Sequence, residues 1–173
     1  MKRVCWAAAV AAVAASALTG CVTVQQVQIS NVYDPALVAP LLAPGNNQVT
    51  GSALIRQSGG GVVTCAGTPV ELVPATPYAK EWARLLFGSD QQGYRSVMGG
   101  ATVITNVDPQ FVKAVRSTTC NAQGFFTFAD VADGDFYTLT RIQWRVGDSM
   151  QGGTLMKAFS VRGGQKQEIV MAP

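Results

Sequence analysis

Side chains suited to chemistry near neutral pH are scarce in this chain of 173 residues. It has no histidine, which excludes Ser-His-Asp triads, Cys-His pairs and histidine metal sites. The spacings of a nucleophile elbow, a phosphate loop or a dinucleotide-binding turn do not occur either. The ten acidic residues are scattered, and nothing marks two of them as the paired carboxylates of a glycosidase. We therefore expect a protein that is not an enzyme and needs no cofactor.

One acidic cluster, made of Asp130, Asp133 and Asp135, raises the question of a metal site. A calcium loop needs alternating oxygen ligands and a distal bidentate carboxylate, and the order Asp-x-x-Asp-Gly-Asp does not match it. Asp and Gly also tolerate the unusual dihedral angles of tight turns. The pattern favours a structural turn and predicts no metal, although it leaves calcium binding at this turn undecided.

The first 20 residues are organised like an export signal. A basic head, Lys2-Arg3, precedes an apolar run over residues 4–18 that is too short to span a bilayer. The run ends in Leu18-Thr19-Gly20-Cys21, which resembles the lipobox of bacterial lipoproteins. The resemblance implies cleavage before Cys21 and attachment of lipid to its thiol, which would hold the mature protein at a membrane. The alternative is an ordinary signal peptide followed by a chance cysteine.

The residue after the acylation position is Val22, where an Asp would favour retention in the inner membrane. This resembles sorting to the outer membrane, so we expect an outer-membrane lipoprotein, on either face of that membrane. Removal of the signal leaves a chain close to neutral whose Lys and Arg residues form no run. Nucleic acid is therefore not an expected partner.

Two of the four cysteines remain available for other roles. Cys5 leaves with the signal and Cys21 carries the lipid, so Cys65 and Cys120 have only each other. Beyond the inner membrane the surroundings are oxidising, and we expect a Cys65–Cys120 disulfide. A reactive thiol pair or a metal site is the alternative, but the chain has no CxxC spacing and no histidine.

Residues 21–46 are expected to form a tether between the lipid and the folded domain. The stretch 22–29 alternates apolar and polar residues, but Pro35, Pro40 and Pro44 argue against a continuous element. A segment of this kind is typical of a spacer that holds a domain away from a membrane.

From residue 47 onward the pattern predicts a mainly β domain. A single helix is predicted from Pro77 to a stop at Gly88, with Thr76 as its N-cap, because apolar residues recur there at helical spacing. Seven or eight short strands with one inserted short helix predict an antiparallel β-sandwich. The main strands are predicted over residues 49–56, 69–73, 112–120, 125–128, 136–146, 155–161 and 166–171, with a tight hairpin turn at 121–124. Further candidate strands are 62–65 and 102–107.

The stretch Thr118-Thr119-Cys120-Asn121-Ala122-Gln123-Gly124-Phe125-Phe126-Thr127-Phe128, followed by Gly134 and Tyr137-Thr138-Leu139, resembles the carboxypeptidase regulatory-like domain. The resemblance implies a transthyretin-like (prealbumin-like) sandwich over residues 47–173, with an insertion at 74–110. Phe136 adds one residue to the family pattern, so we expect a bulge or register shift there. The signature is a folding pattern and implies no activity.

The side chains best suited to anchor a partner lie in or near the insertion. Trp82 is on the predicted helix, and Tyr94 and Arg95 follow in a Gln- and Gly-rich segment that we expect to be a surface loop. Phe125 should point outward if Phe126 points inward. For Trp82, packing against the protein's own sheet is favoured over partner binding, because helical spacing more often marks a core face.

These observations favour a non-enzymatic, membrane-anchored interaction or assembly module of the bacterial cell envelope. Its partner would be another envelope protein or a glycan. The alternatives are a structural or glycan-binding envelope lipoprotein and, third, an unrecognised hydrolase.

Overall fold

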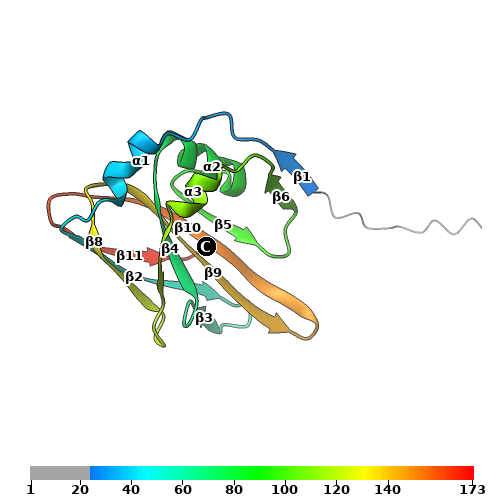
Figure 1. Cartoon of the computed structure of the whole chain (residues 1–173). Coiled ribbons are helices and arrows are strands. Elements are labelled where there is room, and N and C mark those ends of the chain that lie inside the picture. Colours follow the sequence, from blue (N-terminus) through cyan, green and yellow to red (C-terminus); the bar gives the residue numbers. More distant parts are fainter. Residues whose placement is uncertain (1–23) are drawn as a thin grey trace, which may run out of the picture.

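The structure is a computed structural model that describes residues 24–173. The predicted signal peptide and Cys21 lie outside these residues. Two stacked β-sheets form the body, and three helices lie on the outer face of the larger sheet (Figure 1). The predicted β-sandwich is confirmed. No helix within residues 24–173 is both long and apolar enough to cross a membrane.

The larger sheet has five antiparallel strands in the order β5-β10-β9-β4-β7. Its centre is a long hairpin of two 13-residue strands, β9 and β10. The strands are β4 (Pro69–Pro74), β5 (Gln92–Ser96), β7 (Arg116–Thr119), β9 (Gly134–Val146) and β10 (Ser149–Val161).

The smaller sheet is built around β2 (Asn47–Arg56). On one side β2 pairs in parallel with β11 (Lys166–Met171). Antiparallel pairing joins it to β8 (Phe125–Val131) along its first part and to β3 (Val62–Thr64) along its last three residues. The sandwich is therefore antiparallel except for the β2–β11 pair.

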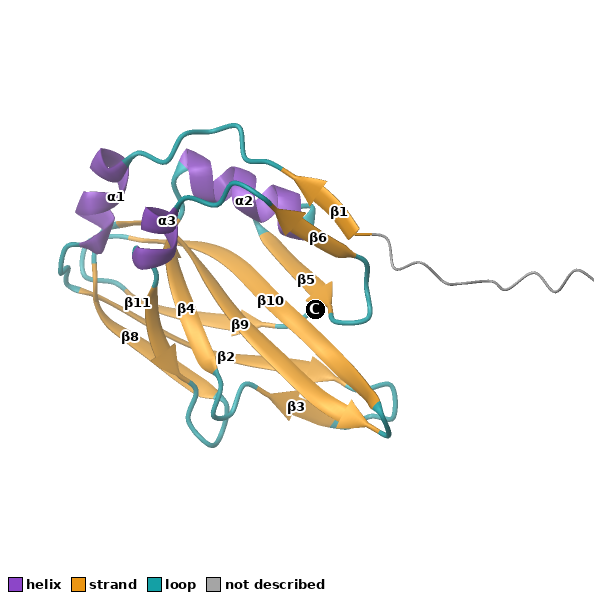
Figure 2. Ribbon diagram, turned by 45° about the vertical axis from the view of Figure 1, so that its right-hand side comes forward, coloured by secondary structure: helices purple, strands orange, loops and turns teal. Residues whose placement is uncertain are grey.

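The larger sheet buries side chains on both of its faces (Figure 2). Residues on its inner face, such as Leu72 and Ile142, pack against the smaller sheet. Residues on its outer face, such as Val73 and Leu139, pack against a helix layer formed by α2 (Pro77–Phe87) and α3 (Pro109–Lys113). Successive residues of a strand point to opposite faces, so this sheet supplies two separate hydrophobic cores.

The two cores explain why the bulge expected at Phe136 is absent. The β9–β10 register runs without a break from the Val146–Ser149 pair to the Gly134–Val161 pair. Phe136 and Tyr137 are both buried, the first in the inner core and the second beneath the helices. Because both faces of the sheet are covered, the extra aromatic residue is accommodated without a change of register, and the prediction was wrong.

Helix α2 begins and ends where the sequence predicts. The Thr76 hydroxyl accepts a hydrogen bond from the Ala79 N–H at 3.4 Å, and Pro77 occupies the first turn. Gly88 has a left-handed conformation (φ 72°) that ends the helix.

The strand predicted over residues 112–120, and its hairpin with 125–128, were wrong. The Asp108 carboxylate caps α3 by accepting a hydrogen bond from the Gln110 N–H at 2.7 Å, and only β7 remains as a strand. β7 pairs with β4 in the larger sheet, whereas β8 pairs with β2 in the smaller one. The connection between them therefore crosses from one sheet to the other, which the local sequence pattern does not reveal.

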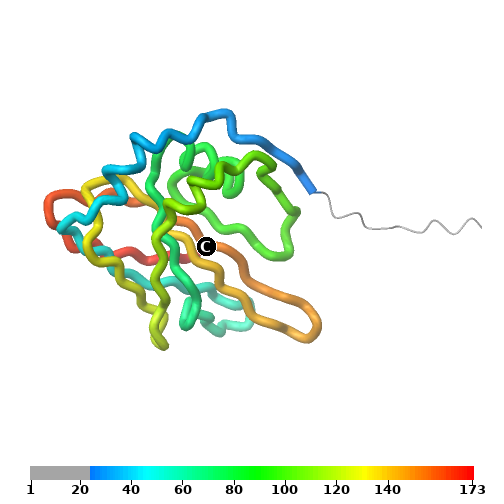
Figure 3. Tube along the Cα trace, in the orientation of Figure 1, coloured from blue at the N-terminus to red at the C-terminus, as the bar shows by residue number. Residues whose placement is uncertain are grey.

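The expected tether is folded onto the domain over its described part, residues 24–46. β1 (Val24–Val27) pairs in parallel with β6 (Ala101–Ile104), and α1 (Pro35–Leu42) follows (Figure 3). Ile29 and Val38 are buried. The spacer prediction was therefore wrong for this stretch.

Polar side chains hold this N-terminal segment in place. The Asn106 amide accepts from the Ile29 N–H and donates to the Ile29 carbonyl, both at 2.8 Å. The Glu81 carboxylate accepts from the backbone N–H groups of Ser30 and Asn31 at 2.8 and 2.7 Å. These long-range contacts supply the backbone partners that a short, proline-containing segment cannot provide for itself.

The predicted disulfide between Cys65 and Cys120 is present, with the two Cα atoms 5.7 Å apart. Cys65 follows β3 and Cys120 follows β7, so the bond joins the two sheets. Both cysteines are buried in the inner core.

Candidate functional site

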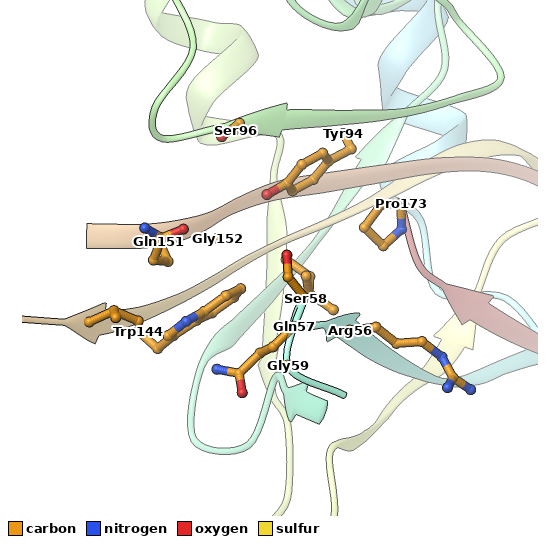
Figure 4. Close-up of a pocket in the computed structure, with 12 residues that line it drawn as sticks. Arg56, Gln57, Ser58, Gly59, Tyr94, Ser96, Trp144, Gln151, Gly152 and Pro173 are labelled. Carbon is orange, nitrogen blue, oxygen red and sulfur yellow. The ribbon is translucent and has the colours of Figure 1, made fainter. Parts of the chain in front are cut away.

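A cleft of about 580 Å³ lies where the tip half of the β9–β10 hairpin faces the turn after β2 (Figure 4). Strand β5 forms its other wall. The lining side chains are aromatic, aliphatic, amide or hydroxyl in character, with Arg56 as the one charged side chain among them. They include Arg56, Gln57, Ser58, Tyr94, Ser96, Trp144 and Gln151.

Two aromatic rings, those of Trp144 and Tyr94, face the cleft from the same sheet (Figure 4). Two glycines of β10 make room for them. A Cβ atom on Gly152 would lie 2.9 Å from Cζ3 of Trp144, and one on Gly153 would lie 2.7 Å from Cε2 of Tyr94. The nearest atoms to these two Cβ positions are backbone oxygens, that of Ile142 at 2.1 Å and that of Arg95 at 2.2 Å. The neighbouring strands and the two rings therefore both lie close to a part of β10 that has no side chains.

Amide and hydroxyl groups surround the two rings. Gln151 is directly opposite Trp144 in the β9–β10 register, and Gln57 and Ser58 belong to the turn after β2. The guanidinium of Arg56 extends away from the rings (Figure 4). A side-chain amide both donates and accepts hydrogen bonds, so two glutamines can bind pairs of hydroxyl groups on one ligand.

This combination of groups matches the two surfaces of a sugar. The C–H groups of a pyranose form an apolar face that fits an aromatic ring, and its hydroxyls need donors and acceptors at the rim. No Asp or Glu side chain is among the residues that line the cleft.

Tyr94 and Arg95 lie in strand β5 and not in the surface loop that the sequence suggested. As neighbours in a strand they point to opposite faces of the sheet. Tyr94 enters the cleft and is 36% exposed. The Arg95 guanidinium, on the outer face, donates to the Thr102 carbonyl at 2.7 Å. The loop prediction failed because the residues of β5 have no strand periodicity of their own and depend on pairing with β10.

Trp82 packs against its own domain, as expected from its helical spacing. Its ring lies 5.5 Å from that of Phe111 and 6.1 Å from that of Phe87, measured between centroids. It remains partly exposed and lines a second groove together with Arg95. Two of the four predicted partner-binding residues are thus brought together, on the face opposite Tyr94.

Phe125, the fourth predicted residue, lies apart from both cavities. It is 52% exposed on β8, while Phe126 is buried, so the predicted orientations are correct. Gly124 forms the preceding turn with φ 83°.

The acidic cluster acts as a clamp on the turn between β10 and β11. The Asp133 carboxylate accepts from Asn47 Nδ2 at 2.8 Å and from the Gly163 N–H at 2.9 Å. Asp135 accepts from Arg162 Nη2 and Ser160 Oγ, both at 2.8 Å.

These hydrogen bonds, all to the Oδ1 atoms, lower the pKa of the Asp133 and Asp135 carboxyl groups. Asp130 has a positive φ of 53°, as Asp tolerates in a turn. Within residues 24–173, no three Cys, Asp or Glu side chains are grouped to hold a metal ion.

The sequence did not single out Trp144, Gln151 or Gln57 as candidate site residues. A signal for Trp144 exists in the two-residue period of β9, which places it on the same face as Ile142. The adjacent Gly152-Gly153 pair is a second signal, since glycines weaken a strand unless something must approach it closely. Neither signal shows which strand or turn lies opposite.

The chain is similar in structure to a proposed carbohydrate-binding protein from Pseudomonas aeruginosa, known from a crystal structure. The TM-score is 0.70 and the sequence identity 22%, and the likeness covers 82% of this chain and 97% of the other. At this identity the likeness shows a shared fold. No protein-family model and no curated protein matches the chain. The carboxypeptidase regulatory-like resemblance therefore stays a prediction.

Proposed function

We propose that this protein is a non-enzymatic carbohydrate-binding module of the bacterial cell envelope. The cleft beside Tyr94 and Trp144 holds a neutral sugar ring. The observation that carries this proposal is the seating of two aromatic rings on a glycine pair, next to glutamine side chains.

The similar fold of the Pseudomonas protein gives the proposal limited support. That protein is itself proposed to bind carbohydrate, and a shared fold does not transfer a ligand. The proposal therefore depends on the geometry of the cleft in this chain.

The location belongs to the same proposal. The lipobox-like motif before Cys21 supports an outer-membrane lipoprotein, and the Cys65–Cys120 disulfide suits an oxidising compartment. Glycans of the cell envelope are accessible from that position.

The test is a titration of the mature chain with neutral oligosaccharides, read by calorimetry and by tryptophan fluorescence. Trp144→Ala should weaken binding at least about fivefold, because stacking on an aromatic face contributes about 1 kcal/mol or more. Phe125→Ala removes an exposed aromatic residue elsewhere and serves as the matched control. Equal affinity of wild type and Trp144→Ala would exclude the cleft. Mass spectrometry of the recovered sugar would reveal a hydrolase by shortened products.

A protein partner is the second candidate, and it is favoured by a different surface. Phe125 and Val170, 52% and 51% exposed, lie on either side of Ser52 in one row of the smaller sheet. Exposed apolar side chains that lie together are typical of protein interfaces. Crosslinking in intact cells should capture less of one stoichiometric partner with Phe125→Ser than with Trp144→Ala. The reverse order would favour the cleft.

A further inference from the structure

A second groove, of about 450 Å³, lies on the outer face of the larger sheet beside the second half of α2. Its wall is apolar and consists of Trp82, Leu86 and Phe87. Its floor carries charged and hydroxyl side chains from four strands. These are Glu71, Arg95, Arg141 and Thr154.

The strand register places two arginines in one row across the sheet. Arg141 of β9 and Arg95 of β5 are both paired with Thr154 of β10, one on each side. The three side chains share the outer face, because the next residue on β10, Leu155, points into the inner core. The Cα atoms of the two arginines are separated across the sheet by two inter-strand spacings, about 10 Å in all.

The groove carries two arginines and one acid, whereas Arg56 is the one charged side chain that lines the cleft. Arg141 is exposed, and Arg95 is held by its hydrogen bond to the Thr102 carbonyl, which leaves other guanidinium N–H groups free to donate. The one acid, Glu71, is in the neighbouring row, opposite Leu139. A guanidinium binds a carboxylate with two parallel hydrogen bonds, so this row is suited to an acidic group.

The cleft and the groove lie on the two faces of a single strand. Tyr94 lines the cleft and Arg95 lines the groove, and β5 is the edge strand of the larger sheet. One saccharide chain that passes around this edge can therefore place successive residues in the two sites.

We propose that the groove binds an acidic sugar residue, a uronate, of the same glycan that enters the cleft. The carboxylate pairs with Arg141 and Arg95, and the sugar ring contacts the exposed part of Trp82. This inference rests on the proposed function, and it makes the ligand a polysaccharide that contains uronic acid.

The test compares an oligogalacturonate with its methyl ester, which has the same sugar chain without the charge. Wild-type protein should bind the acid at least about tenfold more tightly, and the preference should shrink as salt rises. Arg141→Gln should bring the two affinities together, and Arg95→Gln should do so in part. Arg56→Gln removes the charge from the cleft and should leave the preference unchanged. Thermal unfolding confirms that each variant is folded.

The outcomes separate the two sites. Equal binding of acid and ester by wild type overturns the acidic subsite. If Trp144→Ala binds neither the acid nor the ester, the cleft is the site that both ligands share. If Trp144→Ala changes neither affinity while Arg141→Gln abolishes the preference, the groove stands as an acid site and the proposed function of the cleft falls.

A separate observation concerns the N-terminal end of the described chain. Strand β1 begins at Val24, three residues after Cys21. A polypeptide spans at most about 3.5 Å per residue, so Cys21 lies within about 11 Å of the start of β1. An acylated Cys21 would therefore hold the folded domain directly against the bilayer, with no room for a long spacer.

Exposed apolar side chains lie on β1, on β6 and in the connection from β5. Val24, Met98 and Val103 are 54%, 67% and 45% exposed, and residues 97–104 include no charged side chain. β1, β6 and the connection from β5 lie at one end of the molecule, and the start of β11 lies at the other (Figures 1 and 2).

We infer that this end faces the lipid bilayer and that Met98 and Val103 enter its interfacial region. This inference rests on acylation of Cys21, which belongs to the proposed function. The acylated protein is placed in phospholipid vesicles with a nitroxide label on Met98→Cys or, as the matched control, on Lys166→Cys at the far end. The label at position 98 should be more accessible to oxygen than to a water-soluble nickel complex, and the label at position 166 should show the opposite.

Mass spectrometry of the same samples distinguishes the two ways of failing. An acylated protein whose labels at positions 98 and 166 are equally accessible to the nickel complex overturns the orientation alone. A protein without acyl mass at Cys21 overturns the anchor and the orientation with it.

Discussion

The two halves of strand β9 differ in what covers them. From Phe136 to Thr140 the strand is buried on both faces, and Phe136 and Tyr137 are each about 1% exposed. From Gln143 to Val146 every residue is partly or fully exposed, and Trp144 faces the cleft. One strand therefore stabilises the fold in its first part and lines the cleft in its second.

The sandwich therefore has a cleft toward the tip of the β9–β10 hairpin, while its centre is filled with side chains. The two sheets enclose the inner core, and the larger sheet and the helices enclose the outer core. Where the hairpin continues toward its tip, Trp144 packs at the margin of the inner core, and both Trp144 and Tyr94 lie against glycines of β10. Mutations in the two halves should consequently have separable effects.

The largest effect on stability is expected from the covered half. Phe136→Ala removes a fully buried ring from the inner core and should lower the free energy of unfolding by about 3–5 kcal/mol. Urea denaturation of wild type and variant measures this difference. Any protein that stays folded should keep its sugar affinity, and a selective loss of binding at unchanged stability would contradict the division.

Removing the disulfide tests how much the cross-link in the inner core stabilises the fold by restricting the unfolded chain. The cysteines are 55 residues apart, and closing a loop of that length stabilises the folded state by about 4 kcal/mol in the chain-entropy model. Cys65→Ala combined with Cys120→Ala should lower the urea midpoint accordingly. A stability equal to that of wild type would show that the bond adds nothing beyond the packing of the two sheets.

Substitutions near the tip of the β9–β10 hairpin should reduce sugar affinity as well as stability. Gly153→Ala introduces a Cβ that overlaps Tyr94 and the β5 backbone, so Tyr94 must move from its place on the sheet. We expect a moderate loss of stability, about 1–3 kcal/mol, and a loss of sugar affinity as large as that of Tyr94→Ala. Calorimetric titration at a temperature well below unfolding separates the two effects. Gly99→Ala, where the added Cβ would meet no atom closer than 3.4 Å and the backbone has no positive φ, is the control.

The smallest expected effect concerns the N-terminal segment and depends on pH. Hydrogen bonds from the backbone N–H groups of Asn31 and Ser30 lower the pKa of Glu81 from 4.5 to about 2. The folded state thus favours the ionised form. The stabilisation is complete above the unfolded value and is lost as pH falls from about 4.5 toward 2.

Glu81→Gln should remove this part of the acid dependence and weaken protection of the Ser30 and Asn31 amides. Hydrogen exchange at pH 4 to 7 measures the protection, and urea denaturation from pH 2 to 7 measures the stability. Glu168→Gln, on the exposed side of β11, is the control. Identical acid profiles for wild type and Glu81→Gln would show that other groups hold the segment.

Local patterns were sufficient for the features that depend on near neighbours in the chain. Helix α2 was predicted with both ends, because the Thr76 cap, Pro77 and Gly88 act within one turn. The inward and outward directions of Phe126 and Phe125 follow from the two-residue period of a strand. The pairing of Cys65 with Cys120 followed from elimination and the compartment, and the structure confirms it.

Features that depend on distant partners could not be predicted in this way. β5 exists because β10 lies beside it, and the N-terminal segment folds back because Asn106 and Glu81 offer hydrogen bonds from 50 to 77 residues away. The absence of a bulge at Phe136 required knowledge of the helix layer that buries Tyr137.

The sequence by itself therefore determined the β-rich class of the domain, the inserted helix, the disulfide and the lack of histidine chemistry. Only the tertiary structure decided that Trp144 and Tyr94 share a cleft, that Trp82 and Arg95 share a groove on the opposite face, and that residues 24–46 belong to the domain. The physical reason is that caps, turns and strand alternation act over a few residues. A binding surface, by contrast, forms where strands remote in sequence meet and one of them extends beyond the core.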